Sequence, residues 1–114
     1  MRFILDSNII EKNIFKSLGE IIELSSEDIN ANSIRKADGL IIRSLTKVNE
    51  NLLINSKIKF VGTVSSGFDH IDIEFLKKNN IYFASSCGRN ANSVAEYVIA
   101  SLFYLLRNRE NISK

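Results

Sequence analysis

The stretch Lys59-Phe-Val-Gly-Thr-Val-Ser-Ser-Gly-Phe-Asp-His-Ile-Asp72 combines an apolar run, a polar turn and a helix start. The apolar run 60–64 predicts a buried strand, and the turn Ser65-Ser66-Gly67 leads into a helix that we expect to begin near Asp69, with Asp69 as its cap. In open α/β sheets, ligands lie beyond the carboxyl ends of the strands, where backbone N–H groups and a helix N-terminus converge on an anion. This turn is therefore a candidate ligand site, although the same residues also form ordinary turns.

Short apolar runs alternate with helical patterns along the rest of the chain. Further strands are predicted at 3–5, 20–24, 40–42 and 81–84, and helices at 10–18, 25–37, 49–54 and 71–79. The run 40–42 is apolar throughout, which is typical of strands covered on both faces. Because parallel neighbours need a crossover between them, the alternation predicts an α/β fold with a doubly wound parallel sheet.

The last helix, predicted from Ala91 to about Arg109, has two apolar faces. One stripe runs from Val94 to Leu106 at helical spacing, behind a possible capping box at Ser93 and Glu96. A second face carries Ala100, Phe103 and Tyr104. One sheet would cover only one of these faces, so we expect a partner for the second, either a further domain or the same helix of a second copy.

Composition excludes several classes of protein. The 114 residues are 45% hydrophobic, as in one globular domain or a part of one. The net charge of +2 is spread along the chain, which argues against a nucleic-acid partner. A single Cys and a single His cannot build the usual zinc site, so no metal site is expected. The apolar runs are too short for a signal peptide or a membrane span, and the cytoplasm is the expected location.

Polar residues follow the predicted strands 40–42 and 60–64. Ser44 and Ser65 fall at the ends of these two strands, which we expect to be neighbours, and Arg43 can add positive charge. Such a crevice suits a small anion, a carboxylate or phosphate, held by hydroxyls, backbone donors and a guanidinium. The alternative reading makes Arg43 a solvated residue and Ser44 a helix cap.

Other reactive residues are weaker candidates. His70 is the only histidine, but its predicted place in the first turn of a helix favours a hydrogen bond to a neighbouring carbonyl or carboxylate over catalysis. Cys87 lies beside Arg89 without an identifiable base, which favours a spectator thiol. The five glycines form neither a G-x-G-x-x-G nor a P-loop. A phosphoacceptor receiver domain would also have five strands, but Arg43-Ser44 occupies the place of its phosphoacceptor and Ser85 that of its lysine.

Three segments resemble the D-isomer-specific 2-hydroxyacid dehydrogenases: Arg43-Ser-Leu-Thr-Lys-Val-Asn49, Gly62 to Asp72, and Asn90-Ala-x-x-Val-Ala-Glu-Tyr-Val98. The resemblance covers essentially the whole chain and is strongest to the branch of the family that oxidises 4-phospho-D-erythronate. It implies a flavodoxin-like substrate domain, NAD as cofactor, oxidation to a 2-oxo acid in pyridoxal 5′-phosphate biosynthesis, and a cytoplasmic homodimer. Phosphoglycerate dehydrogenase is a related alternative, since it shares the Arg-Ser-x-Thr-Lys-Val run.

By motif position, the resemblance makes Ser44 a substrate-binding serine. It also puts Ser65 where the family usually has a substrate-binding threonine, and it turns the backbone of Ser65, Ser66 and Gly67 toward the substrate carboxylate. With Arg43, these are the predicted substrate-binding residues. His70 does not match the family's catalytic histidine.

The resemblance also implies what this chain lacks. Full-length relatives continue into a Rossmann domain with its glycine fingerprint and then the catalytic Arg, Glu and His. We therefore expect no catalytic, cofactor-binding or metal-binding residue here, a substrate-binding domain at 1–89, and an inter-domain helix at 90–114 that would cross to a missing Rossmann domain. Such a portion would be inactive alone. The competing hypothesis is a free-standing module that binds small anions or another protein.

Overall fold

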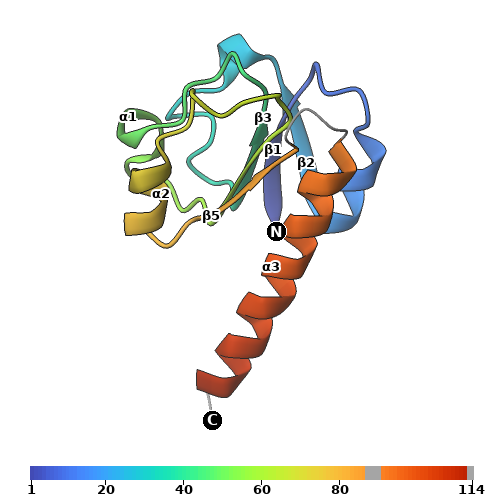
Figure 1. Cartoon of the computed structure of the whole chain (residues 1–114), viewed down its shortest axis with the longest axis vertical. Coiled ribbons are helices and arrows are strands. Elements are labelled where there is room, and N and C mark those ends of the chain that lie inside the picture. Colours follow the sequence, from blue (N-terminus) through green and yellow to red (C-terminus); the bar gives the residue numbers. More distant parts are fainter. Residues whose placement is uncertain (87–90, 113–114) are drawn as a thin grey trace.

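The computed structural model describes residues 1–86 and 91–112. A parallel sheet of five strands forms its centre, in the order β2-β1-β3-β4-β5. The strands are β1 (Arg2–Asp6), β2 (Glu20–Leu24), β3 (Gly39–Ile42), β4 (Phe60–Thr63) and β5 (Tyr82–Ser85). This order is that of flavodoxin-like doubly wound sheets, so the predicted fold class is confirmed (Figure 1).

Helices cover both faces of the sheet, because successive strand residues point to opposite sides. One core lies beneath α1 (Glu50–Leu53), α2 (Ile73–Lys78) and the turns with Ile29 and Ile34 that follow the 3-10 helix η2 (Ser26–Asp28). The other core lies beneath the 3-10 helix η1 (Asn13–Leu18) and the long helix α3 (Ala91–Ile112). The strand residues of the first core are Ile4, Leu40, Ile42 and Val61. Those of the second core are Phe3, Leu5, Ile41 and Phe60.

Two predicted helices in the first half of the chain are wrong in length or type. The predicted helix 10–18 is only the 3-10 helix η1, and Ile10, expected on its apolar face, is 94% exposed. The predicted helix 25–37 is limited to η2 and a series of turns. There, the Asn30 side chain accepts hydrogen bonds from the backbone N–H groups of Asn32 and Ser33, at 3.0 and 2.9 Å. Such side-chain bonds compete with the helical ladder.

The helix after β4 begins later than predicted. Asp72 is its cap, because the Asp72 carboxylate accepts a hydrogen bond of 3.1 Å from the backbone N–H of Phe75. The prediction of Asp69 as the cap is therefore wrong, and His70 lies in the turn before α2 and not in its first turn. The predicted helix at 49–54 is confirmed as α1, with Asn49 as its cap.

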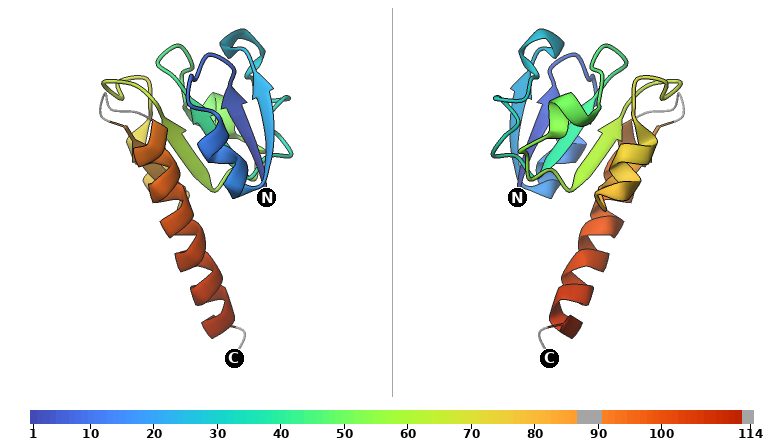
Figure 2. Two further views of the ribbon diagram at one scale, coloured as in Figure 1. Left: turned by 90° about the vertical axis from the view of Figure 1, so that its right-hand side faces the viewer. Right: turned by 90° about the vertical axis from the view of Figure 1, so that its left-hand side faces the viewer.

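Helix α3 packs against the sheet mainly with its first half, and Leu102 and Leu105 further along are partly buried against the same core. Its buried side chains, Val94, Ala95 and Val98, contact the core beside η1, β4 and β5. The second half extends past the sheet (Figure 2), where Phe103 and Tyr104 are 68% and 57% exposed, as the second apolar face predicted. The expected capping box is wrong, since Ser93 lies inside the helix. Cys87 and Arg89 lie outside the described residues.

Candidate functional site

The structure brings the five predicted substrate-binding residues to one crevice. Arg43 and Ser44 follow β3, and Ser65 to Gly67 follow the neighbouring strand β4, whose Thr63 is paired with Ile42. Together with three further residues they line a cavity of about 470 Å³ at the carboxyl edge of the sheet. The further lining residues are Val64, Asp69 and His70. Ser44 and Ser65 therefore share one crevice, as expected from neighbouring strands, while their roles in binding stay predictions.

Backbone hydrogen bonds tie the two loops of the crevice together. Val48 of the first loop donates to the carbonyl of His70 at 2.8 Å, and Asp72 of the second loop donates to the carbonyl of Val48 at 2.8 Å. Val48 and Ile71 thus form an isolated parallel bridge beyond the ends of β3 and β4. Val64 also donates to Ile42 at 2.8 Å. The side chains that line the crevice are consequently held by loops with fixed relative positions.

Donors for an anion in this crevice come from the loops and not from α2. The cap of that helix is Asp72, which does not line the crevice. The exposed Arg43 guanidinium and the exposed Ser44 hydroxyl remain available. Within residues 1–86 and 91–112, the backbone N–H groups of Ser66 and Gly67 donate to no protein acceptor. The expected convergence of a helix N-terminus on the ligand is therefore wrong, whereas the expected hydroxyl, backbone and guanidinium donors are present.

A row of hydrogen bonds runs behind the crevice. The Thr63 hydroxyl lies 2.8 Å from the Ser65 hydroxyl and 2.8 Å from Nε2 of His70. The Ser65 hydroxyl donates to the carbonyl of Gly67 at 2.5 Å. Ser86 donates from its hydroxyl to the Ser65 carbonyl at 3.3 Å. Ser65 is thus held through its side chain and its backbone.

Thr63 and Ser86 are the residues of this network that sequence reasoning missed. Thr63 is fully buried at the end of β4, inside the run 60–64 that predicts an apolar strand. A signal for Thr63 was present, because residues two apart on a strand point to the same side, so its contact with Ser65 could have been predicted.

His70 makes its side-chain bond to a hydroxyl and not to a carbonyl or carboxylate. Its Nε2 is bonded to Thr63, and its own carbonyl accepts from Val48. Burial lowers the pKa of His70 below its ordinary value, and the neighbouring Asp69 carboxylate partly offsets this effect. The neutral ring is consequently the favoured form near pH 7.

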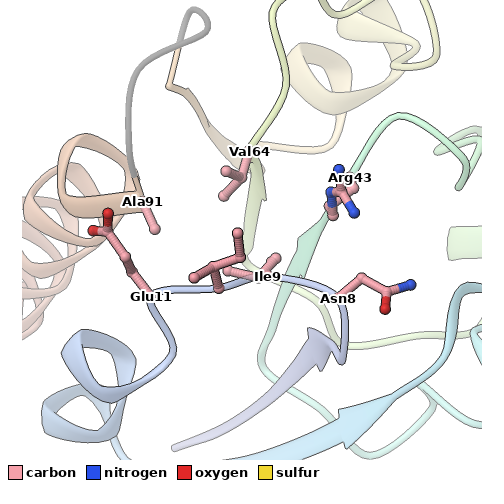
Figure 3. A pocket seen from close by; sticks show the side chains of 7 residues that line it. Asn8, Ile9, Glu11, Arg43, Val64 and Ala91 are labelled. Carbon is pink, nitrogen blue, oxygen red and sulfur yellow. The ribbon is translucent and has the colours of Figure 1, made fainter.

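A second, smaller cavity adjoins the crevice on the side of β1. Its volume is about 200 Å³, and Arg43 and Val64 line both cavities. Figure 3 shows Arg43 and Val64 on one side of this cavity, opposite Asn8 and Ile9 from the loop after β1. It lies where the strand order reverses between β1 and β3, the usual ligand position in sheets of this kind. Arg43 can therefore reach a ligand that extends from one cavity into the other.

The described residues form neither a cluster of metal ligands nor a membrane-spanning helix. No group of three or more His, Cys, Asp or Glu side chains among residues 1–86 and 91–112 is placed to hold a metal ion. In the same part of the chain, no helix has the length and apolar character that crossing a membrane requires.

Comparison with known proteins gives consistent matches. Residues 3–114 match the family model for the D-isomer specific 2-hydroxyacid dehydrogenase, catalytic domain. The chain is 50% identical over 105 residues to a protein of Wigglesworthia glossinidia brevipalpis named erythronate-4-phosphate dehydrogenase, covering 91% of this chain and 28% of that protein. It is 41% identical over 114 residues to the protein of that name from Escherichia coli O157:H7, covering 99% of this chain and 30% of the relative.

Solved structures share the fold. D-lactate dehydrogenase from Aquifex aeolicus, complexed with NAD and lactic acid, matches with a TM-score of 0.64 at 22% identity, over 99% of this chain and 36% of that one. The NAD⁺-bound 3-phosphoglycerate dehydrogenase of Entamoeba histolytica matches with a TM-score of 0.60 at 25% identity, over 75% of this chain and 32% of that one. The chain spans under a third of the length of the curated relatives described above.

Proposed function

The chain belongs to the D-isomer-specific 2-hydroxyacid dehydrogenase family, and we propose that it is the substrate-binding portion of an NAD-dependent oxidoreductase acting on 4-phospho-D-erythronate. The reaction would yield a 2-oxo acid in pyridoxal 5′-phosphate biosynthesis, in a cytoplasmic homodimer. One observation carries the proposal. Arg43, Ser44 and Ser65 to Gly67 line a single crevice, in a chain that is 41% and 50% identical to two relatives named erythronate-4-phosphate dehydrogenase. These identities favour this substrate over that of phosphoglycerate dehydrogenase.

The chemistry of the crevice suits a substrate with two anionic groups. The backbone N–H groups of Ser66 and Gly67, which have no acceptor among the described residues, can donate to a carboxylate, and the Ser44 hydroxyl can add a third hydrogen bond. Arg43 lies between the two cavities and can pair with a carboxylate or a phosphate in a bidentate manner. The described residues would thus bind and orient the substrate.

The residues present do not fit a nicotinamide dinucleotide. Its pyrophosphate is usually held by G-x-G-x-x-G at a helix N-terminus, and the five glycines of this chain, at 19, 39, 62, 67 and 88, do not form that pattern. We therefore assign no step of hydride transfer to this chain. NAD would be held by a further domain, and we expect the 114-residue chain alone to be inactive.

The exposed half of α3 supports this division, with residues 1–89 as the substrate-binding domain and 90–114 as the helix that crosses to the cofactor domain. The second half of α3 extends past the sheet (Figure 2), and Phe103 and Tyr104 of this helix are mostly exposed. Each large apolar side chain left in water forfeits about 1.5–3 kcal/mol relative to burial. A second domain packed against this half would recover that free energy.

A thermal melt of the purified chain, with and without 4-phosphoerythronate, tests the proposal. At about 100 times Kd, a ligand that binds only the folded state adds roughly 2.7 kcal/mol of stability. We expect a higher midpoint with ligand, a smaller increase in Ser44→Ala, and no formation of NADH with NAD⁺.

Ser17→Ala is the matched control, because Ser17 is exposed on η1 and lies outside the crevice. The melting midpoint of this variant should rise with ligand as much as that of the wild-type chain. No increase in a cooperatively melting wild-type chain would contradict substrate binding by this portion. Formation of NADH would contradict the expectation that the chain is inactive alone.

A further inference from the structure

The hydrogen bonds behind the crevice can be assigned a direction, because each hydroxyl has one proton to donate. The Gly67 carbonyl can only accept, so the proton of Ser65 is used in that bond. The hydroxyls of Thr63 and Ser65 are 2.8 Å apart, and the Thr63 proton must therefore lie between them. With its single proton used in this way, Thr63 can only accept from His70.

This assignment fixes the tautomer of His70. Its Nε2 carries a proton and donates to Thr63, Thr63 donates to Ser65, and Ser65 donates to the Gly67 carbonyl. In the neutral ring, this leaves Nδ1 without a proton. Reversing the direction would leave the oxygens of Ser65 and Gly67 facing each other at 2.5 Å without a proton between them, which is strongly unfavourable.

The direction of the bonds determines what Ser65 offers to a ligand. A serine hydroxyl has one proton and two lone pairs. Its proton is bonded to Gly67 and one lone pair accepts from Thr63, so one lone pair remains. Ser65 lines the crevice and is partly exposed, so that lone pair can meet a ligand there. A carboxylate or phosphate oxygen at this place would face a lone pair, whereas a hydroxyl could donate to it.

We infer that His70 is a positioning residue that acts through Thr63 to keep the Ser65 oxygen a hydrogen-bond acceptor, so that Ser65 selects a hydroxyl group of the ligand over its anionic oxygens. The part concerning the ligand rests on the proposed function. The assignment of the His70 tautomer is independent of the proposed function. The anionic groups of the ligand are then bound by the hydrogen-bond donors of Arg43, Ser44 and the backbone of Ser66 and Gly67.

The tautomer is measurable without any ligand. His70 is the only histidine, so the nitrogen signals of an imidazole in the NMR spectrum of the ¹⁵N-labelled chain belong to it alone. Above its pKa, we expect the Nε2–H tautomer to dominate. In Thr63→Val, which removes the acceptor at nearly constant volume, the two tautomers should approach the mixture of a free imidazole. A dominant Nδ1–H tautomer in the wild-type chain would overturn the inference.

The choice of ligand group is tested with two compounds, 4-phosphoerythronate and 4-phosphonooxybutanoate, which differ only in the two hydroxyls. In the wild-type chain, we expect the hydroxylated compound to bind about tenfold more tightly, as one hydrogen bond would give. Ser65→Ala should abolish most of this ratio. It should leave the affinity for 4-phosphonooxybutanoate nearly unchanged, because that compound has nothing to donate to Ser65.

Two variants of His70 distinguish a role in orienting the Ser65 hydroxyl from a role in the stability of the fold alone. Gln can place an N–H donor near the position of Nε2, so His70→Gln should keep the ratio of the two affinities, and His70→Leu should lose it. If His70 had a purely structural role, His70→Leu would weaken the binding of both compounds equally, and that result would overturn the inference. If neither compound binds, the proposed function fails, and the NMR measurement still decides the direction of the hydrogen bonds.

Discussion

Asp72 and Asp69 are two exposed carboxylates at the start of α2, and only Asp72 is bonded to the backbone of that helix. Removing a capping side chain costs about 1 kcal/mol. We therefore expect Asp72→Ala to lower the free energy of unfolding by roughly that amount, measured by urea denaturation. Asp69→Ala removes the same charge and is the matched control, with a smaller expected loss. Equal losses, or a larger loss from Asp69→Ala, would contradict the assigned cap.

The pKa of His70 gives a prediction about pH. Burial lowers this pKa in the folded chain, so the unfolded chain binds the proton more tightly. The stability contributed by the neutral ring is complete above about pH 6.5, the ordinary pKa of histidine, and is lost as the pH falls through the lower folded value. Lys47, Asp69 and Asp72 are the charged residues that line one cavity together with His70.

Urea denaturation at about pH 8 and about pH 5 measures this effect. We expect the wild-type chain to lose more stability on acidification than His70→Gln, in which the titrating ring is absent. If the two proteins lose the same amount, protonation of His70 is not linked to folding in the predicted direction.

At the level of residues, sequence reasoning found the side chains that could be recognised by type and place. Ser44 and Ser65 were expected in one crevice because they follow neighbouring strands, and the structure confirms this neighbourhood. Thr63 and the bond from His70 could not be found in the same way. That contact depends on how the chain turns between Ser65 and Asp72, which the sequence pattern does not determine.

The packing of α3 on the sheet depends on a glycine in β4. A Cβ atom at Gly62 would lie 2.4 Å from Cγ1 of Val94 and 3.1 Å from Cδ1 of Ile41. Val94 is fully buried, so its side chain has little room to move. The absence of a side chain at Gly62 thus allows the helix to approach the strand.

We expect Gly62→Ala to destabilise the fold by about 1–3 kcal/mol, the usual cost of overpacking a core. Gly67→Ala is the matched control, because no heavy atom lies within 4 Å of a Cβ atom built there. Denaturant midpoints of the two variants would measure the difference. A Gly62→Ala chain as stable as the wild type would show that α3 is not packed as described.

Among the elements, strands were predicted better than helices. Each strand is a short apolar run between polar turns, and all five lie within one or two residues of their predicted places. The helices of the first half were overpredicted because Asn30 and Ser33 form local bonds that replace helical ones. Periodicity alone does not reveal such competition.

For the molecule as a whole, the alternation of strands and crossovers predicts a doubly wound parallel sheet, and motifs at three places in the chain predict the family. Both predictions are confirmed, the parallel sheet by its five strands and the family by the match over residues 3–114. The exposed half of α3 was also expected, since Phe103 and Tyr104 lie away from its buried stripe. A second domain that covers them is our proposal.

We propose that the crevice at the carboxyl ends of β3 and β4 holds the substrate. Titration of the ¹⁵N-labelled chain with 4-phosphoerythronate, followed through its backbone amide signals, tests this proposal. We expect the largest signal changes in the two loops 43–48 and 64–72, and smaller changes in Ser44→Ala. Changes centred on the cavity beside Lys57 and Lys59, at the opposite edge of the sheet, or no changes at saturating ligand, would contradict it.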